Sequence, residues 1–380
     1  MNILFISSGS DNSGSAHSLV ALAKILKEKY RLNVKVVIAR KGPIEKQFKN
    51  NSIDYYIIRH YTWIKSNNKE LTFPQRLKNK IKKIINIVGE TRLDKLINDN
   101  EIDIVHLNTI TTGFGAKTAL RNNKRLIWHI REFMDLDLNS DFIKTDKSLK
   151  LINQSDAVIA ISDSVKKHFS SKLNSTKLIR VYNGIDKENY KDKANNVLKK
   201  KIITLTIAGR LAEPKGHIDA IKATSNLIKK GYNVKLQIVG NGDLNYENQL
   251  KKLIIKHDIK NEVKFLGYIA DIHNIWTKTD IALICSKAEA FGRVTVEAMM
   301  GGAIVVGADT KGTAELIGSK YGYTYRQGDS NDLSNVIEYA INNKKYSQTK
   351  ANLAREYAFE NLTATKNADN IYNLYKKIKK

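Results

Sequence analysis

Short apolar runs alternate with amphipathic stretches along the first half of the chain, and this alternation predicts strands followed by helices. Residues 3–6 are a short apolar run, and residues 16–29 carry their leucines at the spacing of one helix face. The other predicted strands of this half are residues 34–39, 53–58, 102–107, 125–130, 157–161 and 177–181. Repeated βα units of this size are typical of a parallel, doubly wound sheet.

A second βα series follows a polar stretch rich in Lys and Asn, residues 187–200, which is typical of a linker. Its predicted strands are residues 201–208, 234–239, 263–266, 281–285 and 303–306. Its predicted helices are residues 217–229, 246–257 and 271–276, and the chain is helical in character from residue 333 to its end. At 380 residues the chain has room for two domains, each with its own core. The pattern therefore predicts an α/β protein with two doubly wound domains.

One predicted helix, residues 74–89, differs from the others because it is both amphipathic and strongly basic. Its apolar positions form one stripe: Leu77, Ile81, Ile84, Ile85 and Val88. Its basic positions lie elsewhere: Arg76, Lys78, Lys80, Lys82 and Lys83. Helices of this composition bind anionic membrane surfaces, and the alternative is a surface helix that packs its stripe on its own sheet. In the preceding segment, Tyr61, Trp63 and Phe73 stand among polar residues, so we expect a mobile loop that contacts acceptor or membrane.

The formal net charge of +26 raises the question of a nucleic-acid partner. The basic excess is spread evenly over both halves of the chain and comes mainly from Lys. No basic stripe with interleaved aromatic residues is present in the sequence. We therefore expect no nucleic-acid binding, and an anionic lipid or a phosphate-bearing acceptor explains the charge better.

The sequence predicts neither export nor a membrane span. The N-terminal apolar run has no basic leader and predicts a first strand rather than a signal peptide. No stretch approaches the roughly 20 apolar residues that a spanning helix needs. The single cysteine, Cys285, falls in a predicted strand, so neither a disulfide framework nor a thiolate metal site is expected. We expect a cytoplasmic protein that can lie peripherally at the inner face of the cell membrane.

The stretch SKAEAFGRVTVEAMMGG, residues 286–302, combines several features of a ligand site. It follows the apolar run 281–285 and contains Glu289 and Glu297, eight positions apart, with Phe-Gly between them. The pattern predicts a strand, a loop, and a helix that begins near Val294. Loops at the carboxyl ends of strands that face a helix N-terminus bind phosphorylated ligands in open α/β sheets. The two glutamates, with the Phe-Gly and Glu-Ala-Met around them, resemble the signature of retaining glycosyltransferases of the GT-B fold, family 4.

This resemblance implies two Rossmann-like domains that face a cleft, residues 1–188 on the acceptor side and residues 200–362 for the nucleotide sugar. A last helix, residues 363–380, would cross back to the first domain. The implied reaction is a retaining transfer of a sugar from a nucleotide-diphosphate donor, with UDP favoured over GDP, to a hydroxyl of a carbohydrate or of a lipid-linked or protein-linked glycan. A bacterial surface polysaccharide or glycoconjugate pathway fits it. The alternatives are a GT-B epimerase or phosphorylase, a non-catalytic nucleotide-sugar-binding protein and, for the glutamates alone, a glycosidase acid and base.

The resemblance also assigns roles to single residues, beginning with the donor. Arg210 and Lys215 flank a turn after a predicted strand and match the family's cationic pair for the diphosphate, and Gly216 lets the backbone pass closely. Glu289 would contact hydroxyls of the donor sugar, and Glu297 would accept hydrogen bonds from the ribose. The remaining donor contacts are Gly14, Gly240, Tyr268 and the segment Phe291, Gly292, Arg293, Val294 and Thr295.

The first domain supplies further candidates. His129 ends a predicted strand and matches a histidine near the donor sugar in relatives, so it is counted with the catalytic residues. Gly14 opens a helix after the first strand, although the family commonly has adjacent glycines where this chain has Ser-Gly-Ser. His106 and Asn108 end another strand and are acceptor-side candidates.

No metal or other cofactor is expected. The resemblance implies that basic residues replace the Mn²⁺ of metal-dependent transferases. The tripeptide Asp135-Leu136-Asp137 has the letters of a metal motif, but we expect a solvated loop there. The segment 312–315 is expected to form a turn that supports the site.

Overall fold

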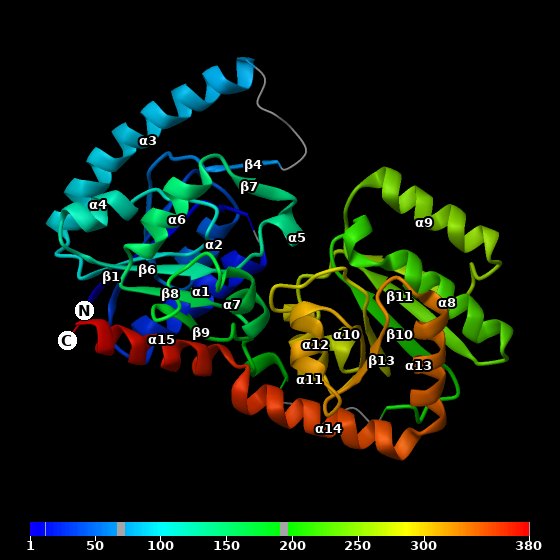
Figure 1. Ribbon diagram of the computed structural model, residues 1–380. Helices are drawn as coiled ribbons and strands as arrows, with labels where there is room; N and C mark the ends of the chain where they lie inside the picture. Colours follow the sequence, from blue (N-terminus) through cyan, green and yellow to red (C-terminus); the bar gives the residue numbers. More distant parts are fainter. Residues whose placement is uncertain (12, 67–72, 191–196, 380) are drawn as a thin grey trace. The chain divides into compact units, whose positions relative to one another are not determined.

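The computed structural model describes residues 1–11, 13–66, 73–190 and 197–379 and divides into two compact units (Figure 1). The N-terminal unit comprises Met1–Gly184 together with Ala364–Lys380, and the C-terminal unit comprises Ile185–Thr363. The chain leaves the first unit just before the expected boundary at residue 188. Residues 191–196 of the predicted linker lie outside the described residues.

A seven-stranded parallel sheet forms the centre of the N-terminal unit, in the order β3-β2-β1-β5-β6-β8-β9. Helices lie on both faces of this sheet (Figure 1), which explains why its strands are nearly continuous apolar runs. All seven strands were predicted: β1 (Asn2–Ser7), β2 (Asn33–Ile38), β3 (Asp54–Ile57), β5 (Ile104–Leu107), β6 (Arg125–Ile130), β8 (Ala157–Ala160) and β9 (Leu178–Arg180). The shorter helices of the unit are α1 (Gly14–Glu28), α2 (Ile44–Asn50), α4 (Ala116–Arg121), α5 (Asp135–Leu138), α6 (Thr145–Asn153) and α7 (Asp163–Phe169).

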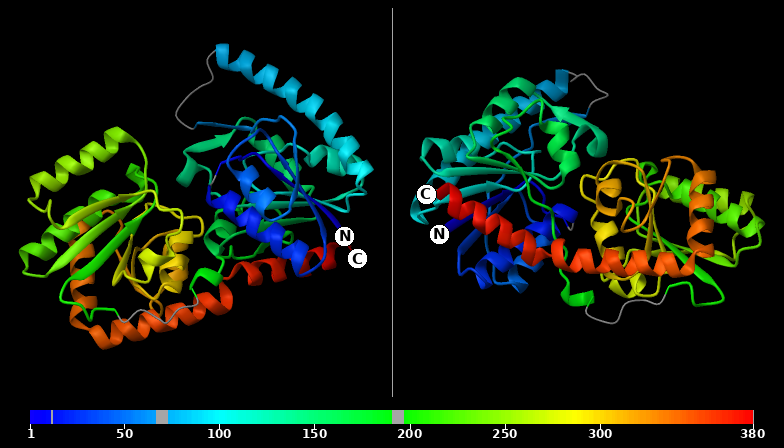
Figure 2. Two further views of the ribbon diagram at one scale, coloured as in Figure 1. Left: turned by 180° about the vertical axis from the view of Figure 1, so that it is seen from behind. Right: turned by 60° about the horizontal axis from the view of Figure 1, so that its bottom comes forward.

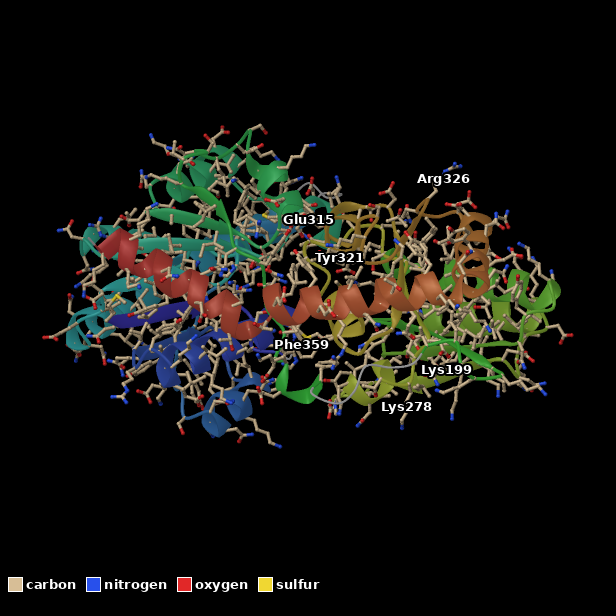
Figure 3. The ribbon with its side chains drawn as sticks, turned by 90° about the horizontal axis from the view of Figure 1, so that it is seen from below. Lys199, Lys278, Glu315, Tyr321, Arg326 and Phe359 are labelled. Atoms are coloured by element: carbon tan, nitrogen blue, oxygen red, sulfur yellow. The ribbon has the colours of Figure 1, made fainter. Side chains whose placement is uncertain are left out.

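The C-terminal unit has a six-stranded parallel sheet in the order β12-β11-β10-β13-β14-β15. Its strands are β10 (Ile203–Ala208), β11 (Val234–Val239), β12 (Val263–Gly267), β13 (Ile281–Ile284), β14 (Ile304–Ala308) and β15 (Tyr323–Tyr325), of which β15 was not predicted. Its helices are η1 (Glu188–Tyr190), η2 (Glu213–Lys215), α8 (His217–Lys229), α9 (Leu244–Lys256), α10 (His273–Trp276), α11 (Arg293–Met300), α12 (Lys311–Ile317), α13 (Ser330–Asn342) and α14 (Lys344–Asn361). Tyr321 lies beside α14 and stacks on Tyr357 with ring centroids 4.5 Å apart (Figure 3).

The segment 312–315 is part of helix α12, so the expectation of a turn was wrong. The helix holds the neighbouring loop, because the Gly312 amide donates to the Glu289 carbonyl oxygen at 2.9 Å. A Cβ on Gly312 would lie 2.7 Å from that same oxygen. The segment supports the loop that carries Glu289, although through a helix rather than a turn.

The last helix, α15 (Ala364–Lys379), packs on the N-terminal unit, as expected from the family resemblance. It runs alongside α1 (Figure 2), where Tyr372 stacks on Tyr30 with ring centroids 3.8 Å apart. Asp369 forms an ion pair with Lys29 at 2.7 Å. Tyr375 is fully buried in the core of this unit, so the end of the chain contributes to the core of the domain in which the chain begins.

A small antiparallel sheet of β4 (Ile64–Ser66) and β7 (Ser140–Phe142) was not predicted. It fixes Trp63, which stacks on Trp128 with ring centroids 5.5 Å apart and donates its indole N–H to the Ile110 carbonyl at 2.7 Å. The expectation of a mobile contact loop is therefore wrong for Trp63. Residues 67–72 of the same segment lie outside the described residues.

Helix α3 (Phe73–Asp99) continues ten residues past the predicted end at residue 89. Its second half is anchored by the buried side chains of Leu93 and Ile97. Its first half does not pack its apolar stripe on the sheet, so that alternative is wrong for the most exposed positions. Their exposed fractions are Leu77 53%, Ile81 52%, Ile84 61% and Val88 55%.

Candidate active site

Lys215 and Glu289 meet at the carboxyl ends of two neighbouring strands. Leu205 of β10 pairs with Ile281 of β13, so the loops that follow these strands lie side by side. Lys215 ends the short helix after β10, and its Nζ donates to Oε1 of Glu289 at 2.6 Å. The two side chains remain 34% and 21% exposed. Two residues that the sequence assigned to the donor therefore form a partly accessible ion pair.

A close backbone approach holds these two loops together. Gly216 has a φ of +71°, and a Cβ at this position would lie 2.2 Å from the carbonyl oxygen of Cys285. The Lys287 amide donates to the Pro214 carbonyl at 2.8 Å, and its ammonium pairs with Glu213 at 2.9 Å. The backbone contacts leave little freedom for the loops, and they set the position of the Lys215–Glu289 pair.

Helix α11 begins at Arg293, one residue before the predicted start near Val294. Gly292 precedes it with a φ of +89°, a conformation that favours glycine. The first amides of a helix have no partner inside it and carry the positive end of its dipole. Thr295 is buried, and its hydroxyl has no hydrogen-bond partner among the described residues. The Phe291 side chain is also buried, so only its backbone can meet a ligand.

Glu297 lies one turn inside α11 and is mostly buried. Its carboxylate is 3.5 Å from the Arg293 guanidinium. Burial raises the pKa of this carboxyl, and Arg293 opposes part of that effect. The neighbouring Tyr190 was not predicted; burial, followed by the charge of Glu297, raises the pKa of its phenol. Nothing in the local sequence could indicate this electrostatic interaction, because Tyr190 stands in a polar segment far from residue 297.

A second group of predicted residues follows β10, β11 and β12. A Cβ on Gly240 would lie 1.9 Å from the Gly209 carbonyl oxygen. The backbones after β10 and β11 therefore approach each other more closely than any side chain at residue 240 would allow. Arg210 comes directly after Gly209 and is exposed, and a Cβ on Gly209 would lie 3.8 Å from the Lys215 side chain. Tyr268 follows β12 and is 62% exposed. The loops of this unit thus bring Arg210, Lys215 and an exposed aromatic ring to one edge of the sheet.

In the N-terminal unit, His129 is buried at the end of β6 and contacts a residue that the sequence analysis did not select. That residue is Arg131, whose Nη2 is 3.3 Å from Nδ1 of His129 and whose Nε donates to Asn108 at 3.0 Å. The sequence could have indicated Arg131, because it stands two positions after His129, directly after the same strand. Gly14 is the first residue of α1 and is exposed.

The acceptor-side assignment of His106 was wrong, because both ring nitrogens are engaged by side chains of the same unit and neither can meet an acceptor. Nδ1 lies 2.6 Å from the Tyr375 hydroxyl, and Nε2 lies 3.2 Å from Nδ1 of His129. Asn108 is buried as well and accepts from Arg131.

Glu132 is another residue that was not predicted. Burial, assisted by the nearby charge of Asp137, raises the pKa of its carboxyl to about 8, against the opposing effect of Arg131. The group is therefore largely protonated at neutral pH and can donate as well as accept a hydrogen bond. Its place directly after Arg131 puts it next to the His129 cluster along the chain.

The aspartates of the Asp-Leu-Asp tripeptide have separate partners. Asp137 accepts from the backbone amides of Phe133 and Met134 at 2.9 Å, and Asp135 lies 3.2 Å from His168. The expected solvated loop is instead the short helix α5. Over the described ranges, no three or more His, Cys, Asp or Glu side chains are grouped as metal ligands.

Within the described part of the chain, no helix combines the length and the apolar character that crossing a membrane requires.

Two family models match the chain over adjacent regions. The model described as Glycosyltransferase Family 4 matches residues 13–189, and the model described as Glycosyl transferases group 1 matches residues 186–358. Each match coincides closely with one of the two compact units.

Relatives with curated descriptions match part of the chain. The capsular polysaccharide biosynthesis glycosyltransferase CapM of Staphylococcus aureus is 25% identical over 58% of this chain and 62% of its own. Protein CapJ of the same species is 28% identical over 37% of this chain and 36% of its own. The N-acetyl-alpha-D-glucosaminyl L-malate synthase of Bacillus anthracis is 26% identical over 59% of this chain and 60% of its own. The matches thus span less than two thirds of these relatives' lengths.

Solved structures share the fold over nearly the whole chain. HepE of Anabaena, solved in complex with UDP, has a TM-score of 0.83 at 21% identity and covers 99% of this chain and 100% of its own. The lipopolysaccharide outer core galactosyltransferase WaaB has a TM-score of 0.73 at 16% identity, with 99% and 100% covered. At this level of identity the likeness establishes the architecture of two parallel-sheet domains.

Proposed function

Because the chain belongs to the family 4 glycosyltransferases and has their GT-B fold, we propose that it transfers a sugar from a nucleotide-diphosphate donor to a hydroxyl acceptor. The observation that carries this proposal is the Lys215–Glu289 ion pair, fixed at the strand ends of the C-terminal unit. In this proposal the ammonium of Lys215 binds the diphosphate, and the carboxylate of Glu289, 2.6 Å away, binds sugar hydroxyls.

The chemistry requires positive groups at the leaving diphosphate. Breaking the bond between the anomeric carbon and the phosphate oxygen leaves its electron pair on the diphosphate, and fixed cations and dipoles aimed at that charge lower the barrier. Lys215 and Arg210 would supply the cations, and the first amides of α11 would supply the dipoles. Glu289 would orient the sugar, and Glu297 would accept hydrogen bonds from the ribose. We propose that these groups replace a metal ion.

We propose that the transfer retains the anomeric configuration through attack on the face from which the diphosphate leaves. The acceptor oxygen bonds to the anomeric carbon, the bond to the phosphate oxygen breaks, and the hydroxyl proton passes to the departing phosphate. The pairing of the two glutamates supports this route over a covalent one. Glu289 is engaged by Lys215 and Glu297 by Arg293, so both carboxylates are suited to orienting rather than to nucleophilic attack.

For the substrates, we propose a UDP-sugar donor and a glycan acceptor in the synthesis of a bacterial surface polysaccharide. The support comes from named similar proteins: HepE has been solved with UDP and with UDP-glucose, and CapM is described as a capsular polysaccharide biosynthesis glycosyltransferase. The acceptor could be free, lipid-linked or protein-linked. A GDP-sugar is the alternative donor.

A donor screen tests the proposal. UDP-, GDP-, ADP- and dTDP-sugars are added to the protein, with Mg²⁺ or with EDTA, and thermal stability and sugar release are measured. We expect a UDP-sugar to raise the unfolding temperature most, because a ligand at 100 times its Kd stabilises by about 2.7 kcal/mol, with the same shift in EDTA. Stabilisation by no nucleotide sugar would contradict the activity, a larger shift with a GDP-sugar would contradict the UDP assignment, and a shift lost in EDTA would contradict metal independence.

We also propose that the first half of α3 binds the surface of an anionic membrane. Its exposed apolar side chains form one stripe, and Phe73 at its start is 81% exposed. A solvent-exposed apolar stripe of this kind marks an interaction site. Four lysines, Lys78, Lys80, Lys82 and Lys83, lie on the same helical turns. Apolar side chains that can enter the lipid interface, together with lysines that attract its phosphates, are what an anionic bilayer requires.

Flotation with vesicles tests this surface. Ile81→Glu combined with Ile84→Glu is expected to reduce binding to anionic vesicles at least roughly 10-fold, because both isoleucines would otherwise enter the lipid. Ile255→Glu is the matched control, since Ile255 is 67% exposed on a helix of the other unit. Wild-type binding should weaken at high salt and be absent on neutral vesicles. Equal binding by the double variant, or loss of binding in the control, would exclude α3 as the contact.

A further inference from the structure

A chain of three buried side chains links the last helix to the strand that carries His129. The Tyr375 hydroxyl of α15 lies 2.6 Å from Nδ1 of His106, and Nε2 of His106 lies 3.2 Å from Nδ1 of His129. All three side chains have no measurable exposure. The far nitrogen of His129, Nε2, is buried and has no hydrogen-bond partner among the described residues.

Arg131 determines which groups donate and which accept in the hydrogen bonds that join these three side chains. A guanidinium can only donate hydrogen bonds, and Nη2 of Arg131 lies 3.3 Å from Nδ1 of His129. Nδ1 of His129 must then be the unprotonated nitrogen, because a proton there would face the guanidinium N–H. Two further residues hold the guanidinium in this place: Nε donates to the backbone and side-chain oxygens of Asn108 at 3.0 Å, and Nη1 donates to the side-chain oxygen of Asn183.

Because Nδ1 of His129 is an acceptor, the positions of the remaining protons are determined as well. Nε2 of His106 must carry a proton in order to donate to it, so Nδ1 of His106 is an acceptor and the Tyr375 hydroxyl donates to it. Burial and the Arg131 charge lower the pKa of both histidines well below the usual range, and burial raises that of Tyr375. All three groups are therefore neutral at physiological pH, as this pattern of hydrogen bonds requires.

We propose that Tyr375 and His106 are positioning residues that hold His129 in the neutral tautomer with its proton on Nε2, where it donates a hydrogen bond to a substrate oxygen. The second half of this statement rests on the proposed glycosyl transfer, whereas the tautomer does not. In this arrangement His129 is a hydrogen-bond donor and not a general base. The N–H groups of His106 and Arg131 both point at Nδ1, which carries the only in-plane lone pair of the ring. The arrangement also gives helix α15 a role in orienting His129, through a tyrosine that does not touch substrate.

The tautomer can be measured without substrate. Two-bond proton–nitrogen NMR spectra of protein labelled with ¹⁵N-histidine distinguish a protonated from an unprotonated ring nitrogen, and His106→Gln and His129→Gln assign the two signals. We expect a protonated Nε2 and an unprotonated Nδ1 for both rings. An unprotonated Nε2 in His129 of the wild-type protein would overturn the proposal, whatever the activity.

Tyr375→Phe tests the positioning role. It removes only the donor to Nδ1 of His106, and we expect the His106 and His129 signals to shift toward a tautomer mixture, with kcat lowered roughly 10-fold and KM changed less than about 2-fold. Tyr372→Phe is the control, because it changes an equivalent side chain on the same helix that stacks on Tyr30. Unchanged spectra in Tyr375→Phe, or an altered spectrum with equal kcat, would overturn the positioning role. If the wild-type protein transfers no sugar, the proposed function fails while the spectra still decide the tautomer.

Discussion

Lys215→Met is expected to lower the kcat of sugar transfer roughly 100- to 1,000-fold, the usual loss when one group that stabilises transition-state charge is removed. The ammonium lies 2.6 Å from Glu289 and is 34% exposed, so it can reach a diphosphate at the same strand ends. Methionine keeps the length and the apolar stem of the side chain but removes the charge. Because partly exposed ion pairs contribute only about 0–1 kcal/mol to stability, the variant should remain folded.

The adjacent pair of Lys287 and Glu213 provides a matched control. It joins the same two loops at 2.9 Å, but its side chains are 54% and 72% exposed. Lys287→Met should therefore leave kcat within about 2-fold of the wild-type value. Steady-state kinetics with the donor found in the screen would compare the variants, and circular dichroism would show that both are folded. Equal kcat in Lys215→Met and wild type would remove Lys215 from the mechanism.

Most of the fold could be predicted because parallel sheets covered on both faces leave a clear record in the sequence. Strands β5 and β8 are buried at every position; β8 is an unbroken apolar run, and β5 is apolar except for His106. The missed strands β4, β7 and β15 have only three residues each, and their sequences Ile-Lys-Ser, Ser-Asp-Phe and Tyr-Thr-Tyr form no apolar run. Their pairing depends on tertiary contacts, such as those of Trp63.

The length of α3 was missed because Gly89 resembles a helix end. In the structure, this glycine lies where a Cβ would be 3.0 Å from both the Arg59 carbonyl oxygen and the Phe114 ring. It therefore permits a close contact inside a continuing helix. The exposure of Ile84 could not be predicted either, because periodicity locates an apolar face but does not reveal whether anything covers it.

Part of the candidate site was accessible to sequence reasoning because parallel topology places all strand carboxyl ends at one edge. This rule brought Lys215 and Glu289 together, although they are far apart in sequence. The buried network around His129 was not accessible in this way. Tyr375 and His106 are 269 positions apart, and their contact depends on the packing of α15, for which the local sequence carries no signal.

Gly216→Ala is expected to destabilise the C-terminal unit by about 3 kcal/mol or more and to abolish transfer. The residue has a φ of +71°, and the new Cβ would stand 2.2 Å from the Cys285 carbonyl oxygen and 2.8 Å from its carbonyl carbon. These are backbone atoms at the end of a central strand, so the collision can be relieved only by separating the loops that carry Lys215 and Glu289.

Gly231→Ala separates this collision from the intrinsic cost of the left-handed conformation. Gly231 has a similar φ of +87°, but a Cβ there would meet nothing within 4 Å. It should therefore show only the conformational penalty of about 1–2 kcal/mol and keep its activity. Urea unfolding and kcat, measured on both variants, give the comparison. If Gly216→Ala were no less stable and no less active than Gly231→Ala, the close approach of the two loops would not be what holds the Lys215–Glu289 pair in place.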